Sequence, residues 1–319
     1  MVITVISAML IGCDNKDIQS EAKADSNQVS ELVSQVFGDK AEVSEEMWMI
    51  TQYGDSSEKQ NSFYLITSNK GRVVVVDAGW RENANQVADE INKWGGHVDA
   101  WILTHPHPDH IGAFDEVYKQ SANAGKADGI VIDAIYDNGL DMDYYDTVDE
   151  EWDEIDVYKE YLEITKEDNK VHHVVVGDKI DIGSLNISFY NAYNENVKSV
   201  VDDIGNNASL VFTMSANDRS MLFVGDCYSE AIINHVFATY GSDIDVCMAQ
   251  MPHHGNSSLP DSYYEQLDLD ICFFDAPAWL VEGEGYTTAA HLAAMEGAGS
   301  FCLDQSTAPN MVPFYAEDK

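Results

Sequence analysis

Three histidines and an aspartate lie within six residues of this sequence, in the order HxHxDH from His105 to His110. Imidazole and carboxylate groups are the ligands that Zn²⁺ and similar divalent ions bind in proteins. The apolar run Ala100–Leu103 precedes the motif and predicts a buried strand, which would fix the start of the loop. The prolines at positions 106 and 108 favour extended backbone at the residues before them. The motif therefore predicts a metal site, because a His-rich surface turn has no reason to keep this spacing.

Polar residues suited to metal binding also follow three other apolar runs. Asp77 ends one run, Gly225-Asp226 follows a second, and His253-His254 follow a third. Layered α/β domains place their chemistry at such carboxyl ends of strands. Two metal ions held about 3.5–4 Å apart by a shared carboxylate can generate a hydroxide and clamp a displacement reaction. We therefore expect these four segments to meet in one two-metal site.

The rest of the chain predicts the elements that would position these residues. β-branched and alternating runs predict strands, and apolar residues at helical spacing predict helices between them. The predicted strands are residues 47–52, 62–68, 72–76, 98–103, 130–136, 171–176, 185–190, 209–214, 221–224, 245–251, 269–274 and 300–303, and the predicted helices are 28–37, 82–94, 113–121, 229–240 and 288–297.

Together these motifs resemble the metallo-β-lactamase superfamily over about residues 45–305. The order Asn206–Val211, Gly225-Asp226 and His253-His254-Gly255 is similar to the hydrolase domain of bacterial DNA-uptake competence proteins and to the surface phosphorylcholine esterase of streptococci. The resemblance implies an α/β fold, the αββα four-layer sandwich, in which two mixed sheets face each other with helices outside.

The resemblance also implies a role for each motif residue. Two divalent ions are expected, zinc or alternatively manganese. One of His253 and His254 would bind metal while the other contacts the scissile group or gives a proton to the leaving group, and Asp109 and His254 are the residues expected to take part in catalysis. The implied ligands are His105 and His107 for the first ion, Asp109 and His110 for the second, Asp226 as the bridge, and His253 or His254, with Asp77 and Asn207 supporting them from behind.

Two positions depart from the wider superfamily. Many members supply a histidine where this chain has Asn206 and Asn207, and asparagine is a weak zinc ligand. Relatives often show Gly-His-Pro where this chain has Gly285-Tyr286-Thr287, which leaves His291 as a weak substitute. A non-catalytic site is the alternative that these departures favour.

An acidic insert at residues 137–168 interrupts the alternation of strands and helices. It carries Tyr144, Tyr145 and Trp152 among many carboxylates. Aromatic faces and negative charge suit a quaternary ammonium group, so these three residues are a candidate substrate cation site. The competing interpretation is a solvated acidic helix whose aromatic residues pack on the sandwich.

Charge and the N-terminus bear on location and partners. The chain has 17 Lys and Arg against 56 Asp and Glu, a net charge of −39, which repels nucleic acid and makes it a poor substrate. Residues 1–12 resemble a lipoprotein signal peptide that ends before Cys13, so we expect a lipid to be attached to Cys13. After it we expect a polar tether with a short helix over residues 13–40 and one hydrolase domain over residues 41–319. Pairing among Cys227, Cys247, Cys272 and Cys302 stays open, because four cysteines allow three pairings.

The sequence as a whole favours an extracellular hydrolase that is anchored to the bacterial membrane through Cys13. Its substrate would be a small or cell-surface phosphoester, cleaved as a phosphodiesterase by a hydroxide held between two metal ions. The alternatives are a non-catalytic metal- or choline-binding surface lipoprotein and a nuclease of the competence type.

Overall fold

The structure, a computed structural model, describes residues 22–200, 202–257, 259–265 and 267–315. The expected signal peptide and Cys13 lie outside these residues. Within the described part of the chain, every helix is too short or too polar to cross a bilayer.

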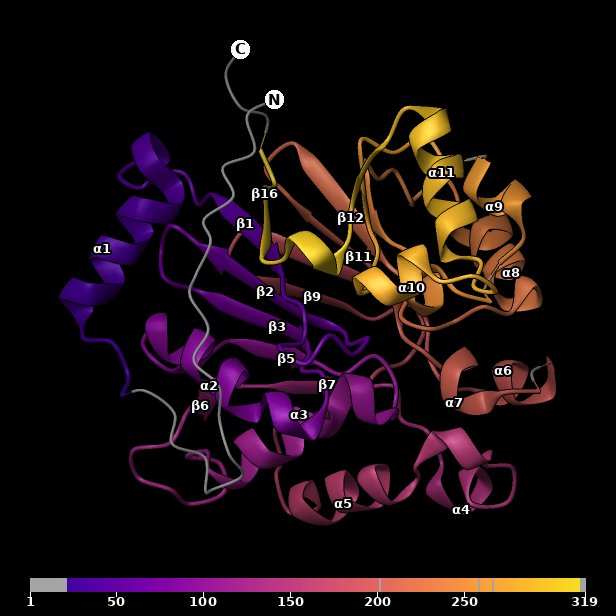
Figure 1. Ribbon diagram of the computed structural model, residues 1–319. Helices are drawn as coiled ribbons and strands as arrows, with labels where there is room; N and C mark the ends of the chain where they lie inside the picture. The colour runs from indigo at the N-terminus through magenta and orange to yellow at the C-terminus, as the bar shows by residue number, and fades with distance from the viewer. Residues whose placement is uncertain (1–21, 201, 258, 266, 316–319) are drawn as a thin grey trace.

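Two seven-stranded mixed sheets form the centre of the molecule (Figure 1). The first has the order β16-β1-β2-β3-β5-β7-β8, and the second has the order β15-β14-β13-β12-β11-β10-β9. The first comprises β1 (Trp48–Gln52), β2 (Phe63–Ser68), β3 (Val73–Asp77), β5 (Ala100–Ile102), β7 (Ile135–Asp137), β8 (Val171–His173) and β16 (Asn310–Pro313). The second comprises β9 (Lys179–Ile182), β10 (Leu185–Asn191), β11 (Val211–Ala216), β12 (Arg219–Phe223), β13 (Met248–Gln250), β14 (Ile271–Phe273) and β15 (Phe301–Leu303), and a small separate sheet pairs β4 (His97–Val98) with β6 (Val131–Ile132).

Helices cover the outer faces of the sheets (Figure 1). On the first half of the chain these are α1 (Ser26–Phe37), η1 (Gly38–Lys40), η2 (Arg81–Asn83), α2 (Ala84–Lys93), α3 (Pro108–Lys119), α4 (Met142–Tyr145), η3 (Glu151–Asp153) and α5 (Asp156–Thr165). On the second half they are α6 (Glu195–Val200), α7 (Ile204–Asn207), α8 (Glu230–Tyr240), η4 (Pro252–Gly255), α9 (Asp261–Glu265), α10 (Ala278–Glu282), α11 (Thr288–Ala298) and η5 (Gln305–Thr307).

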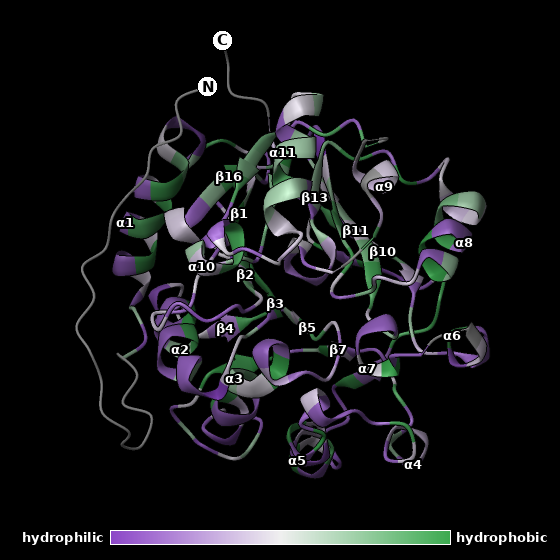
Figure 2. Ribbon diagram, turned by 45° about the vertical axis from the view of Figure 1, so that its right-hand side comes forward, coloured by the Kyte–Doolittle hydropathy of each residue, from purple (hydrophilic) through white to green (hydrophobic). Residues whose placement is uncertain are grey.

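Both faces of the central strands are buried, which is why their sequences read as continuous apolar runs. In β3, Val74 and Val76 belong to the core between the two sheets, whereas Val73 and Val75 belong to the core beneath the helices. Figure 2 shows the hydrophobic strands inside and hydrophilic residues on the outer helices. The predicted four-layer αββα sandwich is confirmed.

Several elements differ from the sequence prediction. The second half of the acidic insert forms the helix α5, as its sequence predicts, and the first half adds α4 and η3. The strand β16, which pairs with β1 in the first sheet, was not predicted. The helix expected within the 13–40 tether is α1, and Phe37 at its end is buried in the core of the domain. The four described cysteines, whose pairing the sequence left open, are all free thiols.

Candidate metal centre

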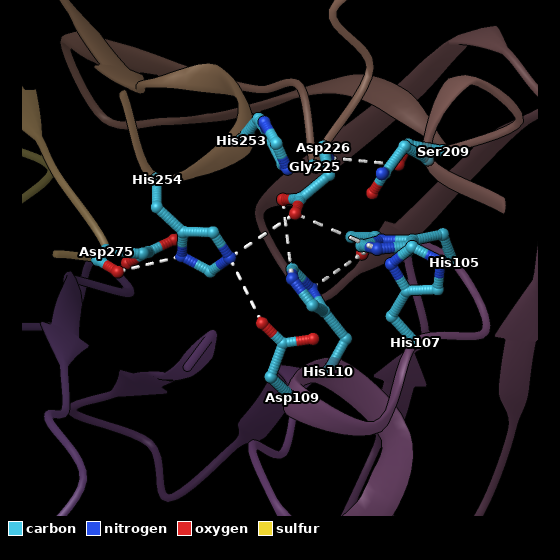
Figure 3. A network of polar contacts seen from close by, with 12 residues as sticks. His105, His107, Asp109, His110, Ser209, Gly225, Asp226, His253, His254 and Asp275 are labelled. Carbon is cyan, nitrogen blue, oxygen red and sulfur yellow. Dashed lines mark hydrogen bonds and ion pairs between the residues drawn. The ribbon is translucent and has the colours of Figure 1, made fainter. Parts of the chain in front are cut away.

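The HxHxDH motif forms the turn that leads from β5 into α3 (Figure 3). His107 is the N-cap residue of α3, and Pro108 occupies its first turn, where a missing backbone N–H costs nothing. Asp109 and His110 therefore lie on the first turn of a helix, where the helix dipole favours the aspartate charge. Four potential ligands of the motif are thus held by a rigid strand on one side and a helix on the other.

Asp77 orients this turn from behind. Its Oδ2 lies 2.7 Å from His110 Nδ1, and its Oδ1 accepts a hydrogen bond of 2.8 Å from the backbone N–H of Thr104. The hydroxyl of Thr104 in turn lies 3.1 Å from Nδ1 of His105. A carboxylate that holds one ring nitrogen fixes the tautomer and the orientation of the imidazole. The structure therefore places Asp77 where the sequence expected a supporting residue.

The two adjacent histidines after β13 point to different partners. Nδ1 of His254 lies 2.8 Å from the backbone oxygen of Asp275, and its Nε2 lies 3.2 Å from Asp109 Oδ2. Nδ1 of His253 lies 2.7 Å from the backbone oxygen of Asn256, and no dashed line joins its ring to the cluster in Figure 3. Only His254 belongs to a ligand group among the described residues, so the structure makes it the candidate ligand of the pair and separates His253 from the predicted set.

Asp226 lies at the centre of the cluster. Gly225 before it has φ 56°, and a side chain there would lie 2.8 Å from Ser209 Cβ, so this approach requires glycine. The backbone N–H of Asp226 donates to Ser209 Oγ. Its carboxylate oxygens lie near three imidazole Nε2 atoms, at 3.9 Å from His105, 3.3 Å from His110 and 3.3 Å from His254.

The same three imidazoles share one unusual property. The Nε2 atoms of His105, His110 and His254 and Oδ1 of Asp226 are all buried and lack a hydrogen-bond partner. Buried polar atoms are rarely left in this state, because desolvation without a hydrogen bond costs about 1–3 kcal/mol each. Their contacts with carboxylates are close but lack hydrogen-bond geometry, as expected of ligands arranged around a cation.

Two overlapping groups of three ligand atoms result. His105, His110 and Asp226 form one group, and Asp109, His110 and His254 form the other, each with its ligand atoms within 4.8 Å of one another. Nitrogen and carboxylate oxygen in this mixture fit zinc or manganese. The residues present therefore fit the divalent ions that the sequence predicted.

Electrostatics in the cluster follow from burial and from the two carboxylates. Burial disfavours the imidazolium form of His254, but the charges of Asp226 and Asp109 outweigh it and raise the pKa of His254 to about 10. Burial also opposes ionisation of Asp226, yet the neighbouring imidazoles, His110 first, hold its pKa well below the usual range. Burial and the nearby imidazole of His110 lower the pKa of His105, so the histidines of the cluster differ in how readily they take up a proton.

The ring of His107 contacts the acidic insert, whereas the ring of His105 faces Asp226. Its Nε2 lies 2.7 Å from Oδ1 of Asp153 in the acidic insert, and the two residues form a third ligand group with Asp203. Sequence reasoning missed Asp153 and Asp203. Both are ordinary members of acidic stretches, and no spacing distinguishes them from the surrounding carboxylates.

The predicted supporting and substitute residues serve structural roles. Oδ1 of Asn207 accepts hydrogen bonds from the backbone N–H groups of Tyr228 and Ser229, which fixes the chain just after Asp226. His291 is buried, stacks on Tyr264 and lies 2.6 Å from the backbone oxygen of Gly255 through Nδ1. It belongs to none of the ligand groups among the described residues.

The structure does not bring the three aromatic residues of the insert together as a cage. Tyr145 is fully buried, whereas Trp152 is 60% exposed. Tyr144 has the ammonium group of Lys198 4.3 Å from the centre of its ring, so a cation of the protein already occupies that face. Tyr145 fits the competing interpretation, in which the aromatic residues pack on the sandwich. Its ring makes an edge contact with the ring of Tyr158.

A family model and the solved structure of a metallo-beta-lactamase fold protein agree with this fold. A family model for the metallo-beta-lactamase superfamily matches residues 57–178, and no curated protein matches the chain in sequence. The metallo-beta-lactamase fold protein YhfI from Bacillus subtilis has a TM-score of 0.53 at 11% identity, over 84% of this chain and 99% of that one. A variant of the CmlA beta-hydroxylase has a TM-score of 0.49 at 11% identity, over 91% of this chain and 59% of that one.

Identities this low show the fold alone, and the narrower resemblance to competence proteins and to phosphorylcholine esterase stays a prediction. The chain therefore has the metallo-β-lactamase fold, and its residues 57–178, which include the HxHxDH motif, match the metallo-β-lactamase superfamily.

Proposed function

We propose that this chain is a metal-dependent hydrolase that cleaves a phosphodiester in a small or cell-surface molecule. The observation that carries the proposal is the convergence of three buried, unpartnered imidazole Nε2 atoms around the carboxylate of Asp226. Divalent ions bound there would activate water and neutralise the negative charge that develops on a phosphate.

The protein's own groups prepare this site before any substrate arrives. Asp77 and the backbone oxygen of Asp275 hold the Nδ1 atoms of His110 and His254, so that both rings keep a fixed orientation. His253 is half-buried beside the cluster, and its burial lowers its pKa, so it stays neutral near pH 7. With Nδ1 directed at a carbonyl, its Nε2 keeps a lone pair that can accept a hydrogen bond from a substrate.

Two observations narrow the substrate class. A net charge of −39 repels long polyanions, which argues for a small phosphodiester over nucleic acid and against the nuclease alternative. Because Tyr144, Tyr145 and Trp152 do not form a cage, nothing in the insert supports a quaternary ammonium head group.

Hydrolysis of bis(4-nitrophenyl) phosphate tests the proposal. We expect the zinc- or manganese-loaded protein to release nitrophenol, to lose this activity in a chelator and to regain it when metal returns. Both histidines after β13 have positive φ, which asparagine tolerates, so His254→Asn and His253→Asn form a matched pair. His254→Asn should lose bound metal and activity together, whereas His253→Asn should keep its metal.

The proposal is wrong if the wild-type protein binds its full complement of metal but hydrolyses no phosphodiester faster than His254→Asn does. That result would leave the second candidate, a non-catalytic metal-binding surface protein, which the departures at Asn206, Asn207 and Tyr286 favour.

We further propose that the protein works outside the cell, attached to the membrane by a lipid on Cys13. The support is the apolar stretch of residues 1–12, which directly precedes Cys13. In a bacterial host, labelled palmitate should enter the wild-type protein, and Cys13→Ser should remove the label and release the protein from the membrane fraction. Equal labelling of the two proteins contradicts the anchor.

A further inference from the structure

A second concentration of buried ligands lies beside the cluster, on the side of the acidic insert. His107 supplies Nε2, Asp153 comes from η3 of the insert, and Asp203 is the N-cap residue of α7. The three residues are 6%, 1% and 7% exposed, respectively. One ligand atom from each lies within 4.8 Å of the other two. Three segments far apart in the chain therefore converge on one small buried space.

The other atoms of these carboxylates are already oriented by the protein. Oδ2 of Asp153 accepts a hydrogen bond of 2.8 Å from the backbone N–H of Glu150. Oδ2 of Asp203 accepts hydrogen bonds from the side chain of Asn206 and the hydroxyl of Tyr228. Partners of this kind fix the direction of a metal ligand, and the same feature marks the supported imidazoles of the neighbouring cluster.

The hydroxyl of Tyr145 is an independent observation that points to a ligand in this space. Its side chain is fully buried, and its hydroxyl makes no hydrogen bond of normal geometry, although it is close enough to Asp153 for that charge to add to burial in raising its pKa. The hydroxyl faces the same point as the other two groups. A Cβ on Gly205 would lie 2.8 Å from Tyr145 Oη, 2.6 Å from His107 Nε2 and 2.7 Å from Asp153 Oδ1.

The charges of the two carboxylates favour a cation in this space. The carboxylates of Asp153 and Asp203 accept hydrogen bonds from backbone N–H groups, an asparagine and a tyrosine, and the only basic side chain they contact among the described residues is His107. One imidazole can offset at most one of the two negative charges. Burying charge without compensation is costly, and a divalent cation neutralises both carboxylates at once. One nitrogen and two carboxylate oxygens are a ligand set that zinc and manganese accept.

We propose that His107, Asp153 and Asp203 bind a divalent cation, with the acidic insert as the source of one ligand. In this assignment His107 remains a metal ligand, as the sequence predicted, but its partners are carboxylates of the insert and of the segment before α7. Binding at this site does not depend on the hydrolysis proposed above, and its test reads bound metal instead of turnover.

The experiment counts zinc per chain by mass spectrometry after gel filtration of the zinc-loaded full-length protein. Asp153→Asn and Asp203→Asn should each bind one Zn²⁺ fewer than the wild type, or bind that ion at least about tenfold more weakly in calorimetry. Asp149→Asn is the matched control, because it removes the same charge from an exposed position of the same insert. It should keep the wild-type count.

Gly205→Ala probes the same space from another direction. Its methyl group would occupy the point on which the three polar atoms converge, so this variant should also lose one Zn²⁺ while circular dichroism shows a folded protein. If Asp153→Asn does not fold, Asp203→Asn still tests the site, because Asp203 belongs to a different segment, the N-terminus of α7.

Folded variants that keep the full zinc count and affinity would overturn the site. In that case the contact between His107 and Asp153 is an internal ion pair, and Asp153→Asn should lower the melting temperature without changing the metal content. A protein that hydrolyses no phosphodiester still gives a clear zinc count, so failure of the proposed function and failure of this site are distinguishable.

Discussion

Asp226→Asn is expected to lower phosphodiester hydrolysis by about 10²-fold or more and to remove at least one bound divalent ion. The carboxylate of Asp226 lies within 3.3–3.9 Å of three imidazole Nε2 atoms, more than any other acid at the site. Asparagine keeps the shape of the side chain but loses the charge, and its amide is a weak metal ligand. Mutation of residues that only orient a ligand already costs about 10–100-fold in affinity or activity, so loss of a central ligand should cost at least as much.

The measurements are the rate with bis(4-nitrophenyl) phosphate and the zinc content of the same preparation. Asp245→Asn is a suitable control, since this exposed aspartate lies just before β13 and outside the three ligand groups. It should behave as wild type in both measurements. An Asp226→Asn protein that retains its zinc and hydrolyses within twofold of wild type would refute the central role of this carboxylate.

Asp115→Asn is expected to stabilise the protein at pH 8–9 by an amount on the order of a few kcal/mol. Asp115 lies on α3, its side chain is fully buried, and neither carboxylate oxygen has a hydrogen-bond partner. The nearest cation is Arg81, whose Nη2 lies 3.9 Å away and which also pairs with Glu116 and Glu160. Burial first, and then the charge of Glu160, raises the pKa of Asp115 to about 8.

The sign of the pH dependence comes from that shift. An aspartate in an unfolded chain titrates near pH 3.9, whereas folded Asp115 holds its proton up to about pH 8. Between these values the folded state binds more protons than the unfolded state, so stability falls as the pH rises. Asparagine does not titrate, so the difference in unfolding free energy between Asp115→Asn and wild type should grow from about pH 4 to about pH 8.

Urea unfolding of both proteins at several pH values in this range measures the difference directly. Asp245→Asn, again exposed, should show no such growth. A stability difference that stays constant with pH would mean that Asp115 is ionised in the folded protein and that Arg81 compensates its charge.

Much of the site was predictable from the sequence because its residues are placed by local rules. His105 lies in the turn after β5 and His110 lies on the first turn of α3, the next element of the chain, so their spacing alone brings them together. Asp77 and Asp226 each come directly after an apolar run, and carboxyl ends of strands collect on the same edge of a layered fold. Local sequence therefore sets which residue stands at the end of each strand, and the order of the strands in the sheets sets where that residue lies.

In the acidic insert, local sequence patterns do not predict which side chains meet the sandwich. Its acidic and aromatic composition predicted a cation site of Tyr144, Tyr145 and Trp152, but composition does not say which face of each short helix meets the sandwich. The fold buries Tyr145 and exposes Trp152. It also brings Asp153 against His107, 46 residues earlier in the chain.

By itself the sequence determined the HxHxDH loop and the strand ends that carry Asp77, Asp226 and the two adjacent histidines, because periodicity and local order specify these features. The sandwich was predicted from the resemblance of these motifs to the metallo-β-lactamase superfamily. The tertiary structure decided that His254 and not His253 faces the cluster. Both residues have a left-handed backbone, and the ring of His254 contacts the backbone oxygen of Asp275, whereas the ring of His253 contacts that of Asn256. The tertiary structure also decided that His107 faces the insert. Such choices depend on contacts between distant segments, which no local pattern in the sequence encodes.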